Sequence, residues 1–342
     1  MLAATTRMYQ EAAAAAGATA EQFSANQGVI EALAARLRNR PPRLVVTCAR
    51  GSSDHAATFA KYLIEQELGI PVVSFTPSLS SLHGKGFGGE DVLFLAISQS
   101  GGSPDILAAA ELARQQGALV AALVNVVDSP LGRAAECVVP LHAGPELSVA
   151  ATKSFITTLA ALLQLVCAWS GRAEARAALD DLPRALEASW AGDWAGAAPL
   201  LAGAESLFVI GRGLGLGVAQ ELALKFKETC RIHAEAFSGA EVRHGPMALV
   251  GQGFPVIVLA QDDESRSGLE ALAREFVERG ALVLAAGLDL AGARPLPVPA
   301  GPAMLGPLLA IQGCYQLVEA VALARGLDPD RPPYLAKVTR TL

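Results

Sequence analysis

The sequence contains two similar segments about half a chain apart, and this internal similarity limits the possible folds more than any other feature. L-V-V-T-C-A-R-G in the first half is similar to L-F-V-I-G-R-G in the second, with Arg50 and Arg212 at the corresponding position, an offset of 162. The letters G-A-L-V occur at Gly117 and again at Gly280, an offset of 163. Two separate matches at almost one offset predict two tandem copies of one structural unit.

Short apolar runs alternate with helical stretches in both copies. The runs are rich in β-branched residues and nearly continuous, which is typical of parallel strands covered on both faces. We therefore expect an α/β protein in which each copy is an open parallel sheet flanked by helices. The predicted strands are 44–48, 72–75, 92–97, 119–123, 207–210, 256–259 and 282–285.

The chain of 342 residues is long enough for two domains that each have a core. The duplication and the composition together predict five segments. They are N-terminal helices over 1–40, a first domain over 41–171, a helical connector over 172–204, a second domain over 205–330 and a tail over 331–342.

Composition excludes several classes of function. The net charge is −6 and no basic run occurs, which argues against nucleic acid as a partner. The five cysteines are scattered without a C-x-x-C pair, so we expect buried free thiols in a reducing compartment and no metal site. The N-terminus has no apolar signal core, and the uncharged stretches 154–171 and 300–318 contain polar residues. We expect buried helices there, no membrane partner and a cytoplasmic protein.

The stretch S-Q-S-G-G-S-P-D follows the predicted strand 92–97 and allows two interpretations. In one, Ser103 caps a helix, Pro104 occupies its first turn and Asp105 complements its dipole, with no ligand. In the other, unpaired N–H groups at the helix start, together with the hydroxyls of Ser98, Ser100 and Ser103, bind an anion such as a phosphate. The residues alone leave both open.

The loops that follow corresponding strands differ between the two copies. Ser52 and Ser53 follow the first predicted strand, and the carboxyl ends of parallel strands are where open α/β sheets bind ligands. In the second copy the corresponding loops read G-R-G-L-G-L-G and A-Q-D-D-E-S-R-S, without the serine pattern. The glycines are not in the order G-x-G-x-x-G, so a tight turn is favoured over a dinucleotide site. The serine pattern favours an anion site in the first copy.

Three further sites combine groups that could carry acid–base chemistry. Lys225 and Glu228 are three residues apart on one helix face, where a surface salt bridge is the simplest interpretation. His244 precedes Gly-Pro, which indicates a turn with an exposed imidazole. Lys337 lies in an apolar C-terminal tail, and docking of that tail would desolvate the amine and favour a Schiff-base nucleophile.

These motifs together resemble the sugar isomerase (SIS) family, in particular the isomerase half of glucosamine-6-phosphate synthase and stand-alone relatives. The motifs are S-Q-S-G-x-S, A-x-K-x-K-E, H-A-E-A, H-G-P-x-A-L and the terminal L-A-K, and the resemblance extends from about residue 25 to the C-terminus. It implies two tandem SIS domains, each a flavodoxin-like three-layer αβα fold.

The resemblance also implies roles for individual residues. Glu228 would shuttle a proton between C1 and C2, His244 would open the sugar ring across the interface of a homodimer, Lys225 would assist the base, and Lys337 would meet the substrate carbonyl. The implied substrate- and phosphate-binding residues are Ser52, Ser53, Ser98, Gln99, Ser100, Ser103, Val149 and Ala336. No metal and no cofactor are implied.

One difference from the family pattern concerns Ala151, which stands where the synthase has a serine that contacts a sugar hydroxyl. A second is that no glutaminase domain is recognised before the first strand, so ammonia release is the expected direction. We therefore expect a glucosamine-6-phosphate deaminase that gives fructose 6-phosphate. Two alternatives stay open: an enzyme for fructosamine 6-phosphates or galactosamine 6-phosphate, and a non-catalytic sensor of sugar phosphates.

Overall fold

The computed structural model describes residues 6–337, which form two compact units. The N-terminal unit contains residues 17–146, 153–181 and 336–337, and the C-terminal unit contains residues 6–16, 147–152 and 182–335. The chain therefore passes between the units several times. The predicted N-terminal helical segment and the predicted tail are each divided between them. The predicted domain boundaries stay a prediction.

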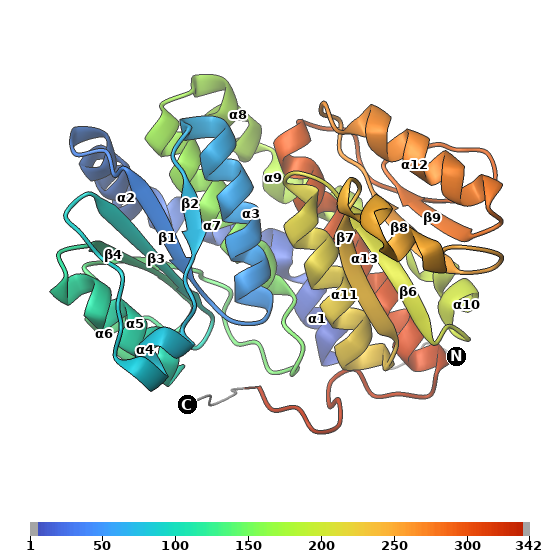
Figure 1. Cartoon of the computed structure of the whole chain (residues 1–342), viewed down its shortest axis with the longest axis horizontal. Helices are drawn as coiled ribbons and strands as arrows, with labels where there is room; N and C mark the ends of the chain where they lie inside the picture. The colour runs from blue at the N-terminus through green and yellow to red at the C-terminus, as the bar shows by residue number, and fades with distance from the viewer. Residues whose placement is uncertain (1–5, 338–342) are drawn as a thin grey trace. The chain divides into compact units, whose positions relative to one another are not determined.

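The N-terminal unit is built on a five-stranded sheet in the order β2-β1-β3-β4-β5, and all four pairings are parallel (Figure 1). Its central strand, β3, is buried along its whole length. The strands are β1 (Leu44–Cys48), β2 (Val72–Ser74), β3 (Val92–Ser98), β4 (Leu119–Val124) and β5 (Cys137–Pro140).

Helices cover both faces of this sheet. Val46 and Phe94 pack into one buried cluster with Ile106 and Ala109 of α5. Successive residues of a strand point to opposite faces of the sheet, so Val45, which is also buried, points to the face opposite α5. On that face α3 contacts β1, β3 and α7. The helices are α2 (Ala15–Asn39), α3 (Ser52–Leu68), α4 (Ser78–His83), α5 (Pro104–Gln115), α6 (Pro130–Ala134), α7 (Lys153–Ser170) and α8 (Ala173–Asp180).

The C-terminal unit repeats this design with a parallel sheet in the order β10-β9-β8-β6-β7 (Figure 1). When the strands are numbered from the first of each unit, the two orders are the same. The tandem duplication predicted from the sequence is therefore confirmed as two copies of one α/β fold. The strands are β6 (Ser206–Gly211), β7 (His233–Ser238), β8 (Pro255–Leu259), β9 (Leu282–Ala286) and β10 (Arg294–Leu296).

Two helical layers also cover the second sheet. Phe276 and Leu272 of α12 pack into a buried cluster with β6, β8 and β9, whereas α11 contacts β6, β7 and α13. The helices are α1 (Arg7–Ala13), α9 (Leu182–Trp190), α10 (Ala198–Leu201), α11 (Gly215–Cys230), α12 (Arg266–Glu278) and α13 (Gly306–Ala324). The 3₁₀ helices are η1 (Ala195–Ala197), η2 (Glu241–His244), η3 (Pro246–Leu249) and η4 (Ala303–Leu305).

All seven predicted strands are present, with bounds within one residue of the prediction. Three strands were missed, and each of them, β5, β7 and β10, lies at the edge of a sheet. Two segments, Lys153–Ser170 and Ala303–Ala324, are long and apolar enough to cross a membrane, but 83% of each apolar window is buried in the structure. Burial of this extent is typical of core helices.

Candidate active site

The S-Q-S-G-G-S stretch, here called the serine loop (residues 98–103), connects the end of β3 to α5. Ser98 is the last residue of β3, and its Oγ accepts a hydrogen bond from the Gly101 N–H at 3.1 Å. The Ser100 Oγ accepts one from the Gly102 N–H at 3.3 Å. A hydroxyl that accepts a hydrogen bond can still donate its proton. The two serines therefore shape the loop and can also donate to an anion.

Gly101 is required by the shape of this loop. Its φ is +60°, a left-handed conformation that favours glycine. A Cβ at this position would lie 2.0 Å from the Ser129 Oγ, which caps α6 by accepting a hydrogen bond from the Gly132 N–H. The Ser129 side chain therefore leaves no space for a side chain at residue 101.

The capping interpretation of the serine loop is correct for Pro104 and wrong for Ser103. Pro104 does occupy the first turn of α5, and Ser103 stands at the N-cap, but its side chain makes no capping hydrogen bond. Asp105 is fully buried and accepts hydrogen bonds from the Arg50 Nε at 2.9 Å and Nη2 at 2.7 Å. Asp105 thus links α5 to the loop that follows β1, and it also lies at the positive, N-terminal end of the helix dipole.

Ser52 and Ser53 lie in the first turn of α3, directly after β1, and both are half-buried. β1 and β3 are neighbours in the sheet, with Cys48 opposite Ala96. Both serine-bearing loops therefore lie at the same carboxyl edge of one sheet, each next to the N-terminus of a helix of at least 12 residues. Backbone N–H groups and hydroxyls at such an edge can hold a phosphate.

Lys337 lies in the same unit, where its Nζ is 2.9 Å from the Glu146 Oε2. The Glu146 side chain is fully buried and also accepts hydrogen bonds from the Ser154 N–H at 3.0 Å and the Ser154 Oγ at 2.6 Å. Burial opposes ionisation of Glu146, but the Lys337 ammonium and the Ser154 donors outweigh it and lower the pKa of the carboxyl. The sequence predicted an apolar setting for Lys337, whereas the structure gives its amine a buried counter-ion. Ala336 beside it is exposed.

Lys225 and Glu228 form an ion pair on α11, as the three-residue spacing suggested, but Lys225 is buried rather than on the surface. Its Nζ lies 2.5 Å from the Glu228 Oε2 and 3.3 Å from the Glu221 Oε1. Burial alone would lower the pKa of the amine, but the two carboxylates raise it well above the ordinary value. Lys225 therefore stays charged, and Glu228, whose side chain is 20% exposed, is the partner that solvent reaches.

His244 is exposed at the end of η2, in agreement with the predicted turn, and Gly245 follows with a φ of +140°. The neighbouring Arg243 pairs with Glu275 of α12 at 2.7 Å, which fixes η2 on the unit. Among the described residues, no hydrogen bond or ion pair joins His244 to Glu228. The structure places both residues in the C-terminal unit but does not bring them into contact.

Val149 belongs to the C-terminal unit, in the short segment 147–152. Its N–H donates to the Asp330 carbonyl at 3.4 Å. The Glu11 carboxylate holds the preceding residues by accepting hydrogen bonds from the Leu147 N–H at 2.5 Å and the Ser148 N–H at 3.2 Å. Ala151, at the family serine position, is half-buried.

Sequence reasoning missed the ion pairs that three buried carboxylates form. Glu146, Glu221 and Asp105 are all buried and each pairs with a basic side chain. Glu221 could have been found from its four-residue spacing to Lys225 on a predicted helix. No comparable signal marks Glu146, because its partner is 191 positions away.

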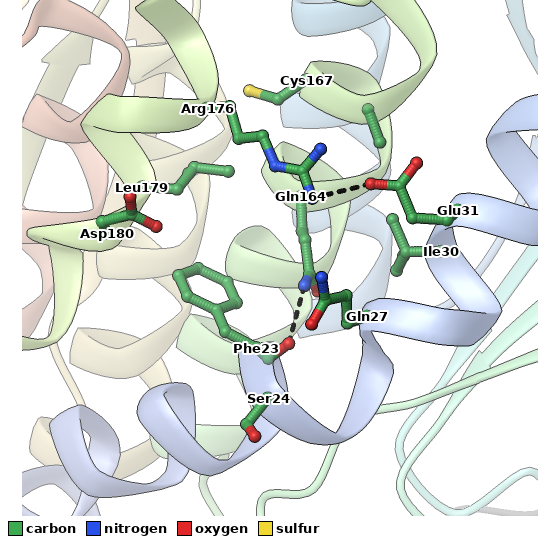
Figure 2. A pocket seen from close by; sticks show the side chains of 11 residues that line it. Phe23, Ser24, Gln27, Ile30, Glu31, Gln164, Cys167, Arg176, Leu179 and Asp180 are labelled. Carbon is green, nitrogen blue, oxygen red and sulfur yellow. Dashed lines mark hydrogen bonds and ion pairs between the residues drawn. The ribbon is translucent and has the colours of Figure 1, made fainter. Parts of the chain in front are cut away.

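A separate cavity of about 380 Å³ lies among α2, α7 and α8 in the N-terminal unit (Figure 2). In it Gln164 donates to the Phe23 carbonyl and Arg176 pairs with Glu31 at 2.7 Å. None of the predicted site residues lines this cavity. Within residues 6–337, no group of three or more His, Cys, Asp or Glu side chains is arranged to hold a metal ion.

Comparison with known proteins identifies the fold family. The SIS domain model matches residues 40–168 and 200–286. A crystal structure described as a candidate phosphosugar isomerase from Silicibacter pomeroyi DSS-3 is 43% identical to this chain and has a TM-score of 0.91. The match covers 95% of this chain and 100% of that one. An isomerizing glutamine–fructose-6-phosphate aminotransferase of Symbiobacterium thermophilum is 38% identical over 87% of this chain and 52% of its own length. The chain thus spans about half the length of the curated relatives it matches.

A third comparison concerns the fold alone. The crystal structure of a glucosamine-6-phosphate deaminase from Thermotoga maritima has a TM-score of 0.80 and 21% identity, over 98% of this chain and all of that one. The two chains therefore share one fold over 98% of the present chain.

Proposed function

Since this chain belongs to the SIS domain family of phosphosugar isomerases, we propose that it is an enzyme that converts glucosamine 6-phosphate and water into fructose 6-phosphate and ammonia. This reaction needs a fixed handle on the phosphate, a group that opens the sugar ring, and a base that moves a proton between neighbouring carbons. The residues of the two units supply a candidate for each part.

The serine loop and the first turn of α3 are the proposed phosphate handle. They offer hydroxyls and backbone N–H groups beside two helix N-termini, and these donors are fixed before substrate binds. Neutral donors at a helix N-terminus favour a dianion without adding a flexible charged side chain. Ser52, Ser53, Gln99 and Ser103 complete this proposed set, and the Val149 and Ala336 backbones would contact the sugar.

Glu228 is the proposed base. It takes the proton from C2 of the open-chain aldehyde and returns it to C1, which turns the C2 amine into an imine. The Lys337 ammonium gives a proton to the C2 imine nitrogen, and the resulting amine adds to C2. The former C2 nitrogen leaves as ammonia, and water hydrolyses the new imine to the ketone and restores the lysine. The observation that carries the proposal is the ion pair of Lys225 with Glu228 on α11, because the buried ammonium holds a carboxylate that solvent still reaches.

His244 is the proposed ring-opening group, and it would act on the sugar bound by a second copy of the chain. Its exposed imidazole at the end of η2 is available to such a partner. A homodimer with two equivalent sites would satisfy this geometry.

An ammonia-release assay tests the proposal with glucosamine 6-phosphate, galactosamine 6-phosphate and a fructosamine 6-phosphate as parallel substrates. Glu228→Gln should lower kcat by ~10²–10⁴-fold, the range that a general base contributes. It should leave the affinity for sorbitol 6-phosphate, which has the phosphate but no carbonyl, nearly unchanged. Absence of turnover with all three substrates would refute the proposed enzymatic function. Sugar-phosphate binding without turnover would support the alternative of a non-catalytic sensor of sugar phosphates. Loss of sorbitol 6-phosphate binding in the variant would make Glu228 structural.

A further inference from the structure

Glu146 is a buried carboxylate that accepts hydrogen bonds from residues outside its own loop. Ser154, in the first turn of α7, donates to both of its oxygens, and the Lys337 ammonium donates to Oε2 at 2.9 Å. The Glu146 side chain is fully buried, whereas the Lys337 side chain is 24% exposed. The Glu146 carboxylate is therefore held in place inside the unit, and the Lys337 side chain paired with it is in contact with solvent.

Hydrogen bonds through Asn125 connect the serine loop to the loop that leads to Glu146. The Asn125 N–H, just after β4, donates to the Gln99 carbonyl at 3.0 Å. The Asn125 side chain accepts from the Ala143 N–H and donates to the Gly144 carbonyl, both at 2.9 Å. Because β3, β4 and β5 are neighbours in the sheet, the loops that follow them lie along one carboxyl edge. Glu146 is two residues beyond Gly144 in the last of these loops.

We propose that Glu146 is the positioning residue that fixes the Lys337 amine at the phosphate-binding edge, so that the amine faces the carbonyl of a sugar phosphate held by the serine loop. This inference rests on the proposed function for the role of Lys337. Glu146 acts through Lys337 and contacts no substrate atom. Lys337 lies outside helix and strand, and the buried Glu146 counter-ion supplies a restraint that the local backbone does not.

The burial of Glu146 explains why this pairing is specific. An unpaired carboxylate that is fully buried is costly, so the pocket strongly favours a cation at the position of the Lys337 Nζ. The exposed pair of Arg36 and Glu136 in the same unit has no such requirement, because both side chains are at least 38% exposed and solvent screens them. Glu136→Gln is therefore the matched control for Glu146→Gln.

The first test measures the position of the lysine without using catalysis. The full-length protein is treated with an amine-acetylating reagent, and the acetylation rate of Lys337 is followed by mass spectrometry relative to the exposed Lys61 on α3. In the wild type, the ion pair should slow acetylation of Lys337. Glu146→Gln should raise that rate several-fold and leave Lys61 unchanged, and Glu136→Gln should change neither. An unchanged Lys337 rate in Glu146→Gln would overturn the proposal, whether or not the protein turns over any sugar phosphate.

The second test separates positioning from general damage. Glu146→Gln should lower kcat for ammonia release by up to ~100-fold, the loss expected from misplacing a reacting group. Sorbitol 6-phosphate, which offers no carbonyl to Lys337, should bind with unchanged affinity. Equal losses of kcat and of sorbitol 6-phosphate affinity would show a merely structural role and overturn the proposal.

A second variant keeps the inference testable if Glu146→Gln fails to fold. Ser154→Ala removes the 2.6 Å hydrogen bond to Oε2 but retains both charges, so it should shift the same two measurements in the same direction by less. A folded Ser154→Ala protein with wild-type Lys337 acetylation and wild-type kcat would count against the proposal. A protein with slow Lys337 acetylation but no turnover would refute the proposed function and leave the positioning role standing.

Discussion

Replacement of Lys225 by methionine is the sharpest test of how α11 is stabilised. Methionine has a similar length and removes only the charge and the hydrogen bonds. The change leaves Glu221, whose side chain is fully buried, beside an apolar group. Removing one partner of a buried ion pair costs about 3–5 kcal/mol, because the remaining buried charge loses its counter-ion. Glu228 loses the same partner but is partly exposed, so water offsets most of its loss.

The expected result is a large loss of stability that a second substitution restores. Thermal unfolding of Lys225→Met should have a midpoint roughly 10 °C below the wild type, since a domain of this size loses about 2–4 °C per kcal/mol. The double variant Lys225→Met/Glu221→Gln should recover most of this loss, because no buried charge remains. Lys227→Met, on the exposed face of the same helix, is the matched control and should change stability by less than about 0.5 kcal/mol.

The pH dependence of Lys225→Met gives an independent check. The pKa of Lys225 is raised in the folded state. Its stabilisation is therefore fully present below the ordinary lysine pKa of 10.5 and is lost as the pH rises through the higher folded value. The difference between wild type and variant should thus persist across neutral pH. A loss of under about 1 kcal/mol, the size of a surface pair, would refute the argument that Lys225 compensates buried charge.

Two further predictions concern the site. If His244 acts across a dimer interface, an equimolar mixture of inactive His244→Asn and Glu228→Gln subunits, unfolded and refolded together, should regain about a quarter of wild-type kcat, because half of the dimers carry one intact site. No recovery in a mixture that sedimentation shows to be dimeric would place both residues in one subunit's site. Gly101→Ala should weaken sorbitol 6-phosphate binding measured by calorimetry and cost at least about 1–2 kcal/mol of stability, because its φ is positive and its Cβ would overlap Ser129. Gly28→Ala, a helical position with open space, is its control, and equal effects of the two substitutions would contradict the steric argument.

The three strands that sequence reasoning missed all lie at sheet edges, although the edge strand β2 was predicted. Interior strands such as β3 and β8 are covered on both faces and have two neighbours, so they read as continuous apolar runs. The missed strands β5, β7 and β10 are all edge strands with partly exposed residues. Their letters, C-V-V-P, H-A-E-A-F-S and R-P-L, carry polar residues or proline, which an edge tolerates and which hides the strand pattern.

Some features of the candidate site depend on residues close together in the sequence, and others depend on contacts between distant residues. The serine loop, the spacing of Lys225 and Glu228 and the exposed turn at His244 are local features, and the sequence predicted each of them. One of the two interpretations left open by the sequence had the Ser103 hydroxyl cap α5; Ser103 stands at the N-cap, but its side chain makes no capping hydrogen bond. Local geometry permits that hydrogen bond, and only the surrounding loop decides whether it forms.

The sequence by itself determined the duplicated α/β fold, because strand and helix patterns repeat with short periods and the two copies align at one offset. It also determined which residue types could hold a phosphate and move a proton. Only the tertiary structure decided which basic side chain pairs with each buried carboxylate: Arg50 with Asp105, and a lysine 191 positions away with Glu146. The energy of a charge depends on how much water and which counter-ions surround it, and chain folding sets both. The sequence therefore predicts that Lys337 is an amine in an apolar setting, whereas in the folded protein it is the partly exposed partner of a buried carboxylate.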